Sequence, residues 1–258
     1  MNLEKGKRYK NHNLRDVIFR LDYAPILQIY GNNKEIAEDF RKKVFDKFPN
    51  VSFKMNTEIN FEFNSDTGMP ENSNKEDNLS WIFTNDAKNH IVELNPNYLI
   101  LHYKNKSYLG FKDFFSDILI ILNALEIYLP IKLRSAGLRY VNQIDETKAK
   151  DFDKYIASSL SNKIAKDFEE NEELIQIFTE LNLKKNDYIL SLKYGLFNPE
   201  FPNPKANKDF ILDYDCRLNN LNTLDDLKED LKNMNKFIYE KFENSITDEL
   251  RKEMSGED

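Results

Sequence analysis

The sequence predicts an α+β fold, in which antiparallel sheet carries helices packed on one side. Several short segments alternate apolar and polar residues, as half-buried strands do, and short polar turns join consecutive ones. Longer segments show helical spacing and end at proline. The 258 residues suit one large domain or two intimately packed halves, which we place at residues 1–147 and 148–258.

The first half is expected to begin with a strand over residues 17–23, in which Arg20 and Asp22 share one face. Apolar residues then recur at helical spacing from Asn33 until Pro49 ends the helix. Four more strands are expected, at residues 57–63, 81–84, 91–94 and 98–103, with a polar loop over residues 64–78.

The strongest helix is expected at residues 111–129, where apolar residues share one face until Pro130. A long strand over residues 132–144 follows it. The remaining expected elements are helices at 151–162 and 166–181, strands at 188–196 and 210–218, and a final helix at 224–252 with Thr223 as its N-cap.

Acidic residues outnumber basic ones, 44 to 37, so the formal net charge is −7. This balance argues against general binding to nucleic acid or to an anionic membrane, because both depend on basic residues that neutralise phosphate. It leaves room for a local basic groove. No apolar stretch has the length of a signal peptide or a membrane span, so we expect a cytoplasmic protein without membrane contact.

No common catalytic motif occurs in the chain. Phosphate-binding loops, dinucleotide fingerprints, zinc-protease helices and nucleophile elbows are all missing from the sequence. Cys216 is the only cysteine, which excludes an internal disulfide and a cysteine-based zinc site, and we interpret it as a small core residue. We therefore expect no metal and no cofactor, and we assign no catalytic residue.

The expected strand over residues 132–144 is the most informative, because both of its faces mix polar and apolar residues. Alternation places Gly137 and Arg139 on one face, and Tyr140 and Asn142 on the other. Mixed faces are typical of a central strand, so we expect helices over Arg139 and a carboxylate beside it. Gly137 indicates a bulge or the close approach of another backbone.

The expected strand over residues 210–218 can supply that carboxylate, since Asp213, Asp215 and Arg217 share one of its faces. Paired carboxylates can hold a divalent cation or accept hydrogen bonds from Arg. Alternation alone is ordinary strand patterning, however, and a solvated outer face of the sheet is the favoured interpretation. The candidate ligand-binding residues are Arg20, Arg134, Arg139, Tyr140, Asn142, Asp213 and Asp215.

Four short blocks of sequence resemble a sporadically distributed family of uncharacterised prokaryotic proteins of similar length. These blocks are Trp81–Thr84, Leu94–Leu99, Arg134–Ile144 and Phe242–Leu250. The resemblance runs through nearly the whole chain and implies no established activity and no catalytic residue. The patchy distribution of the family implies a setting in mobile elements, toxin–antitoxin systems or phage defence.

Three functions are consistent with these observations. The leading hypothesis is a non-enzymatic binding or regulatory subunit that works with a protein partner, for which the final helix offers Phe237, Tyr239 and Phe242 as contact residues. The alternative is a protein that binds nucleic acid or a nucleotide, with nuclease activity as one form of it. Metal-dependent hydrolysis at Asp213 and Asp215, assisted by Glu62, ranks third. The sequence leaves the oligomeric state open.

Overall fold

Nine antiparallel strands form one continuous sheet in the computed structural model, which describes residues 9–29, 34–63, 70–128, 130–145, 151–162, 174–219, 221 and 223–256. The order across the sheet is β2-β3-β4-β5-β1-β6-β9-β8-β7. The strands are β1 (Leu14–Tyr23), β2 (Asn50–Phe63), β3 (Pro70–Thr84), β4 (His90–Leu94), β5 (Tyr98–Tyr103), β6 (Leu133–Ile144), β7 (Ile177–Lys185), β8 (Tyr188–Phe197) and β9 (Asp209–Asn219).

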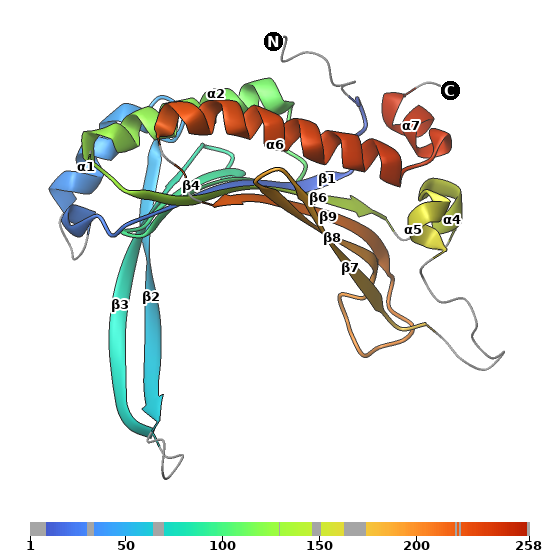
Figure 1. The fold of residues 1–258 in the computed structure, drawn as a ribbon, viewed down its shortest axis with the longest axis horizontal. Coiled ribbons are helices and arrows are strands. Elements are labelled where there is room, and N and C mark those ends of the chain that lie inside the picture. The colour runs from blue at the N-terminus through green and yellow to red at the C-terminus, as the bar shows by residue number, and fades with distance from the viewer. Residues whose placement is uncertain are drawn as a thin grey trace.

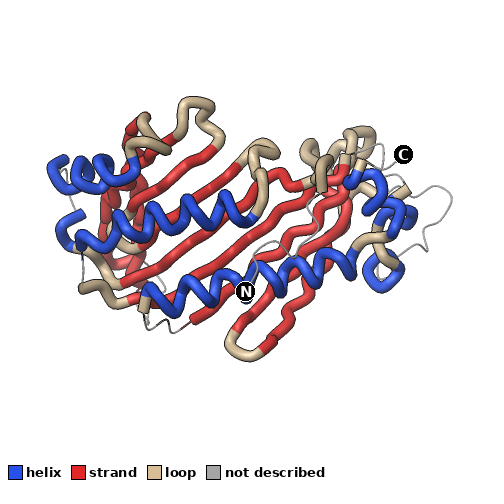
Figure 2. The backbone as a smooth tube through the Cα atoms, turned by 90° about the horizontal axis from the view of Figure 1, so that it is seen from above, coloured by secondary structure: helices blue, strands red, loops and turns tan. Residues whose placement is uncertain are grey.

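The longest helices lie together on one side of this sheet (Figure 1). Seen from above, the two longest lie side by side over the sheet, at a slant to the strands (Figure 2). The helices are α1 (Lys34–Val44), α2 (Phe111–Leu125), α4 (Phe152–Tyr155), α5 (Ser158–Ser161), α6 (Leu224–Ser245) and α7 (Asp248–Ser255), with 3-10 turns at Leu27–Ile29 and Glu126–Tyr128. The predicted α+β class, with antiparallel sheet and helices on one side, is confirmed.

The main core lies between the sheet and this helix layer. On β1, Val17, Phe19, Leu21 and Tyr23 share one face and are fully buried, and the opposite face carries Asp16, Ile18, Arg20 and Asp22. Helices α2 and α6 bury one face each against the sheet, and α6 contacts β6 and β9. Side chains that face the core recur every second residue in a strand and about every 3.6 residues in a helix. The apolar residues of the sequence follow these two spacings, which is why they predicted these elements well.

Strands from both predicted halves belong to this single sheet. Strand β6 pairs with β1 along one edge and with β9 along the other, so residues 1–147 and residues 148–258 meet at the β6–β9 ladder. Side chains on both sides of that ladder belong to one continuous core cluster.

Two predicted elements are wrong in part. The polar loop expected over residues 64–78 is strand from Pro70 onward, because β3 pairs along its length with β2, and cross-strand pairing overrides the weak strand propensity of Ser, Asn and Asp. The helix expected over residues 166–181 contains strand β7 from Ile177, paired with β8. Residues 166–173 lie outside the described part of the chain.

The final helix begins as predicted but does not run to residue 252. Thr223 is its N-cap, since its hydroxyl accepts a hydrogen bond from the Asp226 amide at 3.1 Å. The chain leaves helical geometry at Ile246, which forms a bridge with Ile156, and Thr247 then caps α7. At this break the Ser245 carbonyl accepts a hydrogen bond from the Ala157 amide, and the Thr247 amide donates to the Tyr155 carbonyl.

Aromatic residues expected to offer a contact face on the final helix pack inward instead. Phe237 is buried, and the Phe242 ring lies edge-on to Tyr214 with centroids 6.2 Å apart. These two side chains belong to the core layer, so a partner surface has to be sought elsewhere.

We expect Leu138→Ala to lower the free energy of unfolding by about 2–5 kcal/mol, because Leu138 is fully buried in the central strand β6 and its truncation leaves a cavity. Ile189→Ala on β8, where the side chain is 41% exposed, is the control and should cost less than about 1 kcal/mol. Urea denaturation followed by circular dichroism measures both. Equal losses would contradict the central, covered position of Leu138.

Candidate functional site

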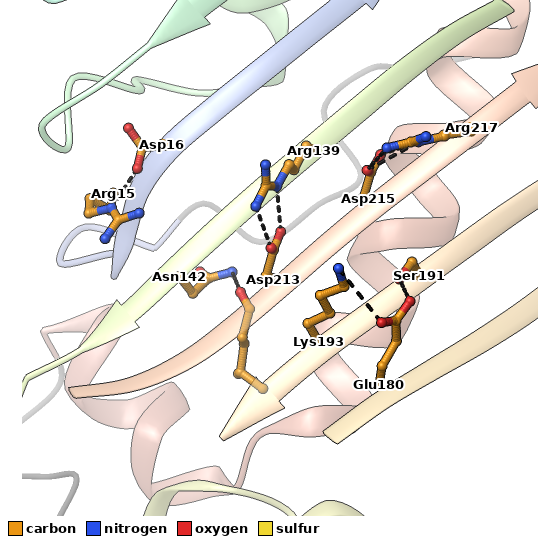
Figure 3. A network of polar contacts seen from close by, with 11 residues as sticks. Arg15, Asp16, Arg139, Asn142, Glu180, Ser191, Lys193, Asp213, Asp215 and Arg217 are labelled. Atoms are coloured by element: carbon orange, nitrogen blue, oxygen red, sulfur yellow. Dashed lines mark hydrogen bonds and ion pairs between the residues drawn. The ribbon is translucent and has the colours of Figure 1, made fainter. Parts of the chain in front are cut away.

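The sheet face turned away from α2 and α6 carries the charged residues of the central strands. We call this surface the open face. In Figure 3 its side chains project in front of the strands, while α6 lies behind them. Its central residues are Asp16, Ile18, Arg20 and Asp22 of β1, Arg139 and Val141 of β6, Asp213, Asp215 and Arg217 of β9, Ile189, Ser191 and Lys193 of β8, and Glu180 of β7.

Arg139 makes a two-pronged ion pair with Asp213 at the centre of the open face. Its Nε donates to Oδ1 at 2.8 Å and its terminal nitrogen donates to Oδ2 at 2.7 Å, from neighbouring strands (Figure 3). The Asp213 side chain is only 10% exposed, whereas that of Arg139 is 46% exposed. This geometry is the strong form of a carboxylate–guanidinium contact.

The expected carboxylate beside Arg139 is therefore confirmed, but the expected helix cover is wrong. Ala136, Leu138 and Tyr140 turn toward the helix layer and are buried, so alternation turns Arg139 to the opposite side. Polar residues on both faces of β6 hid this difference, because the sequence does not show which face the helices cover.

Further ion pairs extend outward from Arg139. Arg217 donates to Asp215 at 2.6 Å, Arg20 lies 2.7 Å from Asp22, and Lys193 lies 3.6 Å from Glu180. Arg15 pairs with Asp16 next to it. Each of these five basic groups, Arg139 included, thus has an acidic partner on the same face, and their charges cancel locally.

Asp16 is held by partners from two sides. Arg15 donates to one of its oxygens, and Nε2 of His102 on β5 lies 2.9 Å from the other. Burial alone would raise the pKa of Asp16, but the hydrogen bonds and charges of Arg15 and His102 outweigh it and lower the pKa. Asp16 is therefore a firmly ionised member of the open face.

The remaining candidates do not join this cluster. Tyr140 is buried on the helix side and its hydroxyl donates to Asn235 Oδ1 of α6 at 2.9 Å. Asn142 is buried and its amide donates to the Leu212 carbonyl at 3.5 Å. Arg134 is exposed near the start of β6. The structure thus brings together Arg20, Arg139, Asp213 and Asp215, and separates the other three.

Gly137 lies between Arg20 and Arg217 in a regular ladder, so the expected bulge is wrong. An added Cβ would lie 3.5 Å from the Cys216 carbonyl oxygen and 3.7 Å from Cγ of Arg217, which are ordinary contacts. The missing side chain leaves space that the Arg217 stem partly covers.

Arg15, Asp16, Lys193 and Glu180 are members of the open face that the sequence alone did not single out. Lys193 alternates with the buried Leu192 and Tyr194, so its face was readable. Glu180 was hidden inside a segment expected to be helix. Asp16 and Arg15 lie at an irregular register of β1, which alternation does not predict.

Chemistry that needs a metal or a nucleophile finds little support in these side chains. Within the described residues, no three His, Cys, Asp or Glu groups converge as metal ligands, and Asp213 and Asp215 accept hydrogen bonds from arginines. The side chain of Glu62 lies outside the described part. Burial raises the pKa of the Cys216 thiol to about 12, which suits a core residue. None of the described helices has the length and apolar character that crossing a membrane requires.

We expect Arg139→Met to lower the free energy of unfolding by about 1–3 kcal/mol, because it leaves the nearly buried Asp213 carboxylate without its two hydrogen bonds. Arg20→Met is the matched control. Its arginine is similarly exposed, but the Asp22 it leaves behind is 29% exposed, so the loss should stay below about 1 kcal/mol. Urea denaturation at neutral pH compares the two, and a smaller loss for Arg139→Met would contradict this account.

Asp16 should stabilise the fold in a pH-dependent way. Because its pKa is lowered on folding, its contribution is present above the unfolded pKa of about 3.9 and is lost as the pH falls through the lower folded pKa. The stability difference between wild type and Asp16→Asn should therefore shrink as the pH falls from about 5 toward about 2. Denaturation across that range measures it. A difference that grows on acidification would contradict the assigned direction.

Comparison with known proteins adds no relative. No protein-family model and no curated protein matches this sequence. Function therefore has to be inferred from the chemistry of the open face and of the cavities beside the sheet.

Proposed function

We propose that this chain is a non-enzymatic binding or regulatory subunit that receives a protein partner on its open face. The observation that carries the proposal is the internal pairing of the charged groups there. Arg139, Arg217, Arg20, Arg15 and Lys193 each lie beside a carboxylate of the same surface.

A surface of this kind suits a polypeptide better than a phosphate backbone. A phosphate approaching Arg139 would meet the carboxylates of Asp213 and Asp215 on the neighbouring strand β9. The ion pair between Arg139 and Asp213 would have to break first. Nucleic-acid affinity depends on cations that are available to neutralise phosphate. Protein interfaces mix charges of both signs, and arginine is enriched in them.

Apolar side chains interleave with the ion pairs. Ile18 and Val141 stand opposite Arg139 and Asp213 in the strand register. Towards the β7 edge, Ile189 is 41% exposed and Phe178 is 48% exposed. Exposed apolar groups surrounded by paired charges form the combination of anchors and polar rim that protein interfaces use.

The shape of the sheet supports the same proposal. In Figure 1 the sheet arches below the helix layer, with the long β2–β3 hairpin descending at one end and β7 and β8 with the following loop descending at the other. A partner on the open face would lie between these two ends. On the family resemblance alone, we place this activity in phage defence or a toxin–antitoxin system.

The proposal is tested by capture from a lysate of the native host, followed by affinity measurement with the purified partner. Ile189→Asp on the open face should weaken partner binding at least about tenfold, because it puts a charge into the apolar part of the contact. Ile127→Asp is the matched control, since Ile127 is also 41% exposed and lies after α2, and it should leave affinity within about twofold.

Two results would contradict this function. One is a consistently solitary monomer in lysate capture. The other is tight binding of RNA or DNA with a steep salt dependence, which requires cations available to phosphate and would favour the nucleic-acid alternative. The expected result for both nucleic acids is weak binding at physiological salt.

A further inference from the structure

A small cavity lies on the helix side of the sheet, away from the open face, and charged side chains form part of its mostly apolar wall. Its volume is about 250 Å³, and its wall includes Asp46 and Lys47 after α1, His90 of β4, Tyr103 of β5, and Asp113 and Asp117 of α2. The three aspartates face one lysine, so the wall carries an excess of negative charge. Burial lowers the pKa of His90, so its ring adds no positive charge near neutral pH.

Asp117 is the unusual member of this cavity. Its side chain is only 3% exposed, and one oxygen accepts a hydrogen bond from the Tyr103 hydroxyl at 2.6 Å. The other oxygen, Oδ1, is buried and accepts no hydrogen bond from any described group. A buried carboxylate oxygen normally has donors, because leaving it without them is costly.

The Lys47 ammonium lies 3.2 Å from Oδ1, as an ion pair outside hydrogen-bonding geometry. The Lys47 side chain is 55% exposed, so it can swing into solvent without disturbing the core. A cationic ligand with better hydrogen-bonding geometry can therefore displace the Lys47 ammonium from the Asp117 carboxylate.

The aromatic wall favours the same kind of guest. The His90 and Tyr103 rings stack in parallel, with centroids 3.6 Å apart. Aromatic faces attract organic cations, and a carboxylate beside such a wall adds a charge-assisted hydrogen bond. Both residues line the cavity, so an alkylammonium or guanidinium group bound to Asp117 would lie beside aromatic atoms.

A bare metal ion fits this cavity poorly. Within the described residues, no three acidic or histidine side chains converge closely enough to ligate one ion, although Asp46, Asp113 and Asp117 share the cavity wall. Separated carboxylates suit a longer ligand that carries positive charge at both ends. The cavity is smaller than the ~300–1,000 Å³ typical of drug-sized ligands, so the guest must be short.

We propose that this cavity binds a short organic dication, with an ammonium or guanidinium group at each end. One end replaces the Lys47 ammonium on Asp117 Oδ1, and the other lies near Asp113 or Asp46. Tyr103 keeps its hydrogen bond to the second oxygen of Asp117 and holds the carboxylate in place.

Isothermal titration calorimetry of the full chain with agmatine tests the proposal, with butylamine and 1-butanol as singly charged and neutral probes that share its four-carbon stem. Agmatine should bind more tightly than butylamine, and 1-butanol should not bind. Asp117→Asn should weaken agmatine binding about tenfold or more, because it removes the charge that strengthens the hydrogen bond. Lys47→Met should strengthen it, because the competing ammonium is gone.

Two variants guard against a folding artefact. Asp113→Asn alters an exposed residue in the first turn of α2 and should weaken agmatine binding by a smaller factor without unfolding the chain. Lys43→Met removes an exposed lysine of α1, outside the cavity wall, and should change nothing. The proposal is overturned if agmatine fails to bind the wild-type chain, or if Lys47→Met and Asp113→Asn bind agmatine as wild type does.

Discussion

The long helices cover only one side of the nine-stranded sheet, and this constraint shapes the rest of the molecule (Figure 1). Every central strand must then present an apolar row to the helices and a second row to the outside. Neighbouring strands bring the outer side chains to about 5 Å of each other. Unbalanced charges at that spacing would repel, and the outer rows pair opposite charges in two ways. Arg139–Asp213 and Lys193–Glu180 join neighbouring strands, whereas Arg20–Asp22 and Arg217–Asp215 each lie along one strand.

The Arg139–Asp213 pair shows that the pairing of opposite charges also includes a side chain that is nearly buried. Asp213 is almost buried even though it belongs to the open face, because the flanking strands and the arginine cover it. A carboxylate at that depth is costly unless donors meet its oxygens, and Arg139 donates to both oxygens of Asp213. The pairing therefore stabilises the middle of the sheet and leaves paired charges on its surface, so the same residues bear on stability and on the protein partner that we propose.

Much of the architecture follows from the sequence, because alternation and helical spacing are local. The buried row of β1 and the apolar face of α2 could be read directly, as could the shared face of Asp213 and Asp215. Which face the helices cover is a tertiary property. The sequence did not show that Arg139 faces away from the helices, because the other face of β6 carries polar residues too. Tyr140 and Asn142 on that face make their hydrogen bonds inside the protein. The polar first part of β3 was missed for a related reason, because its stability comes from pairing with β2 and not from its own composition.

The two proposed sites use opposite sides of the same strand. On β5, His102 turns to the open face and contacts Asp16, while the next residue, Tyr103, turns to the helix side and holds Asp117. The side chains that would meet a protein partner and those that would hold a small cation are thus different, although their backbone is shared. Side chains of a strand alternate between its two faces, so one strand can contribute to a separate polar network on each face. Strand β5 therefore lines the cavity and also supports the open face, and the two networks do not compete for the same hydrogen bonds.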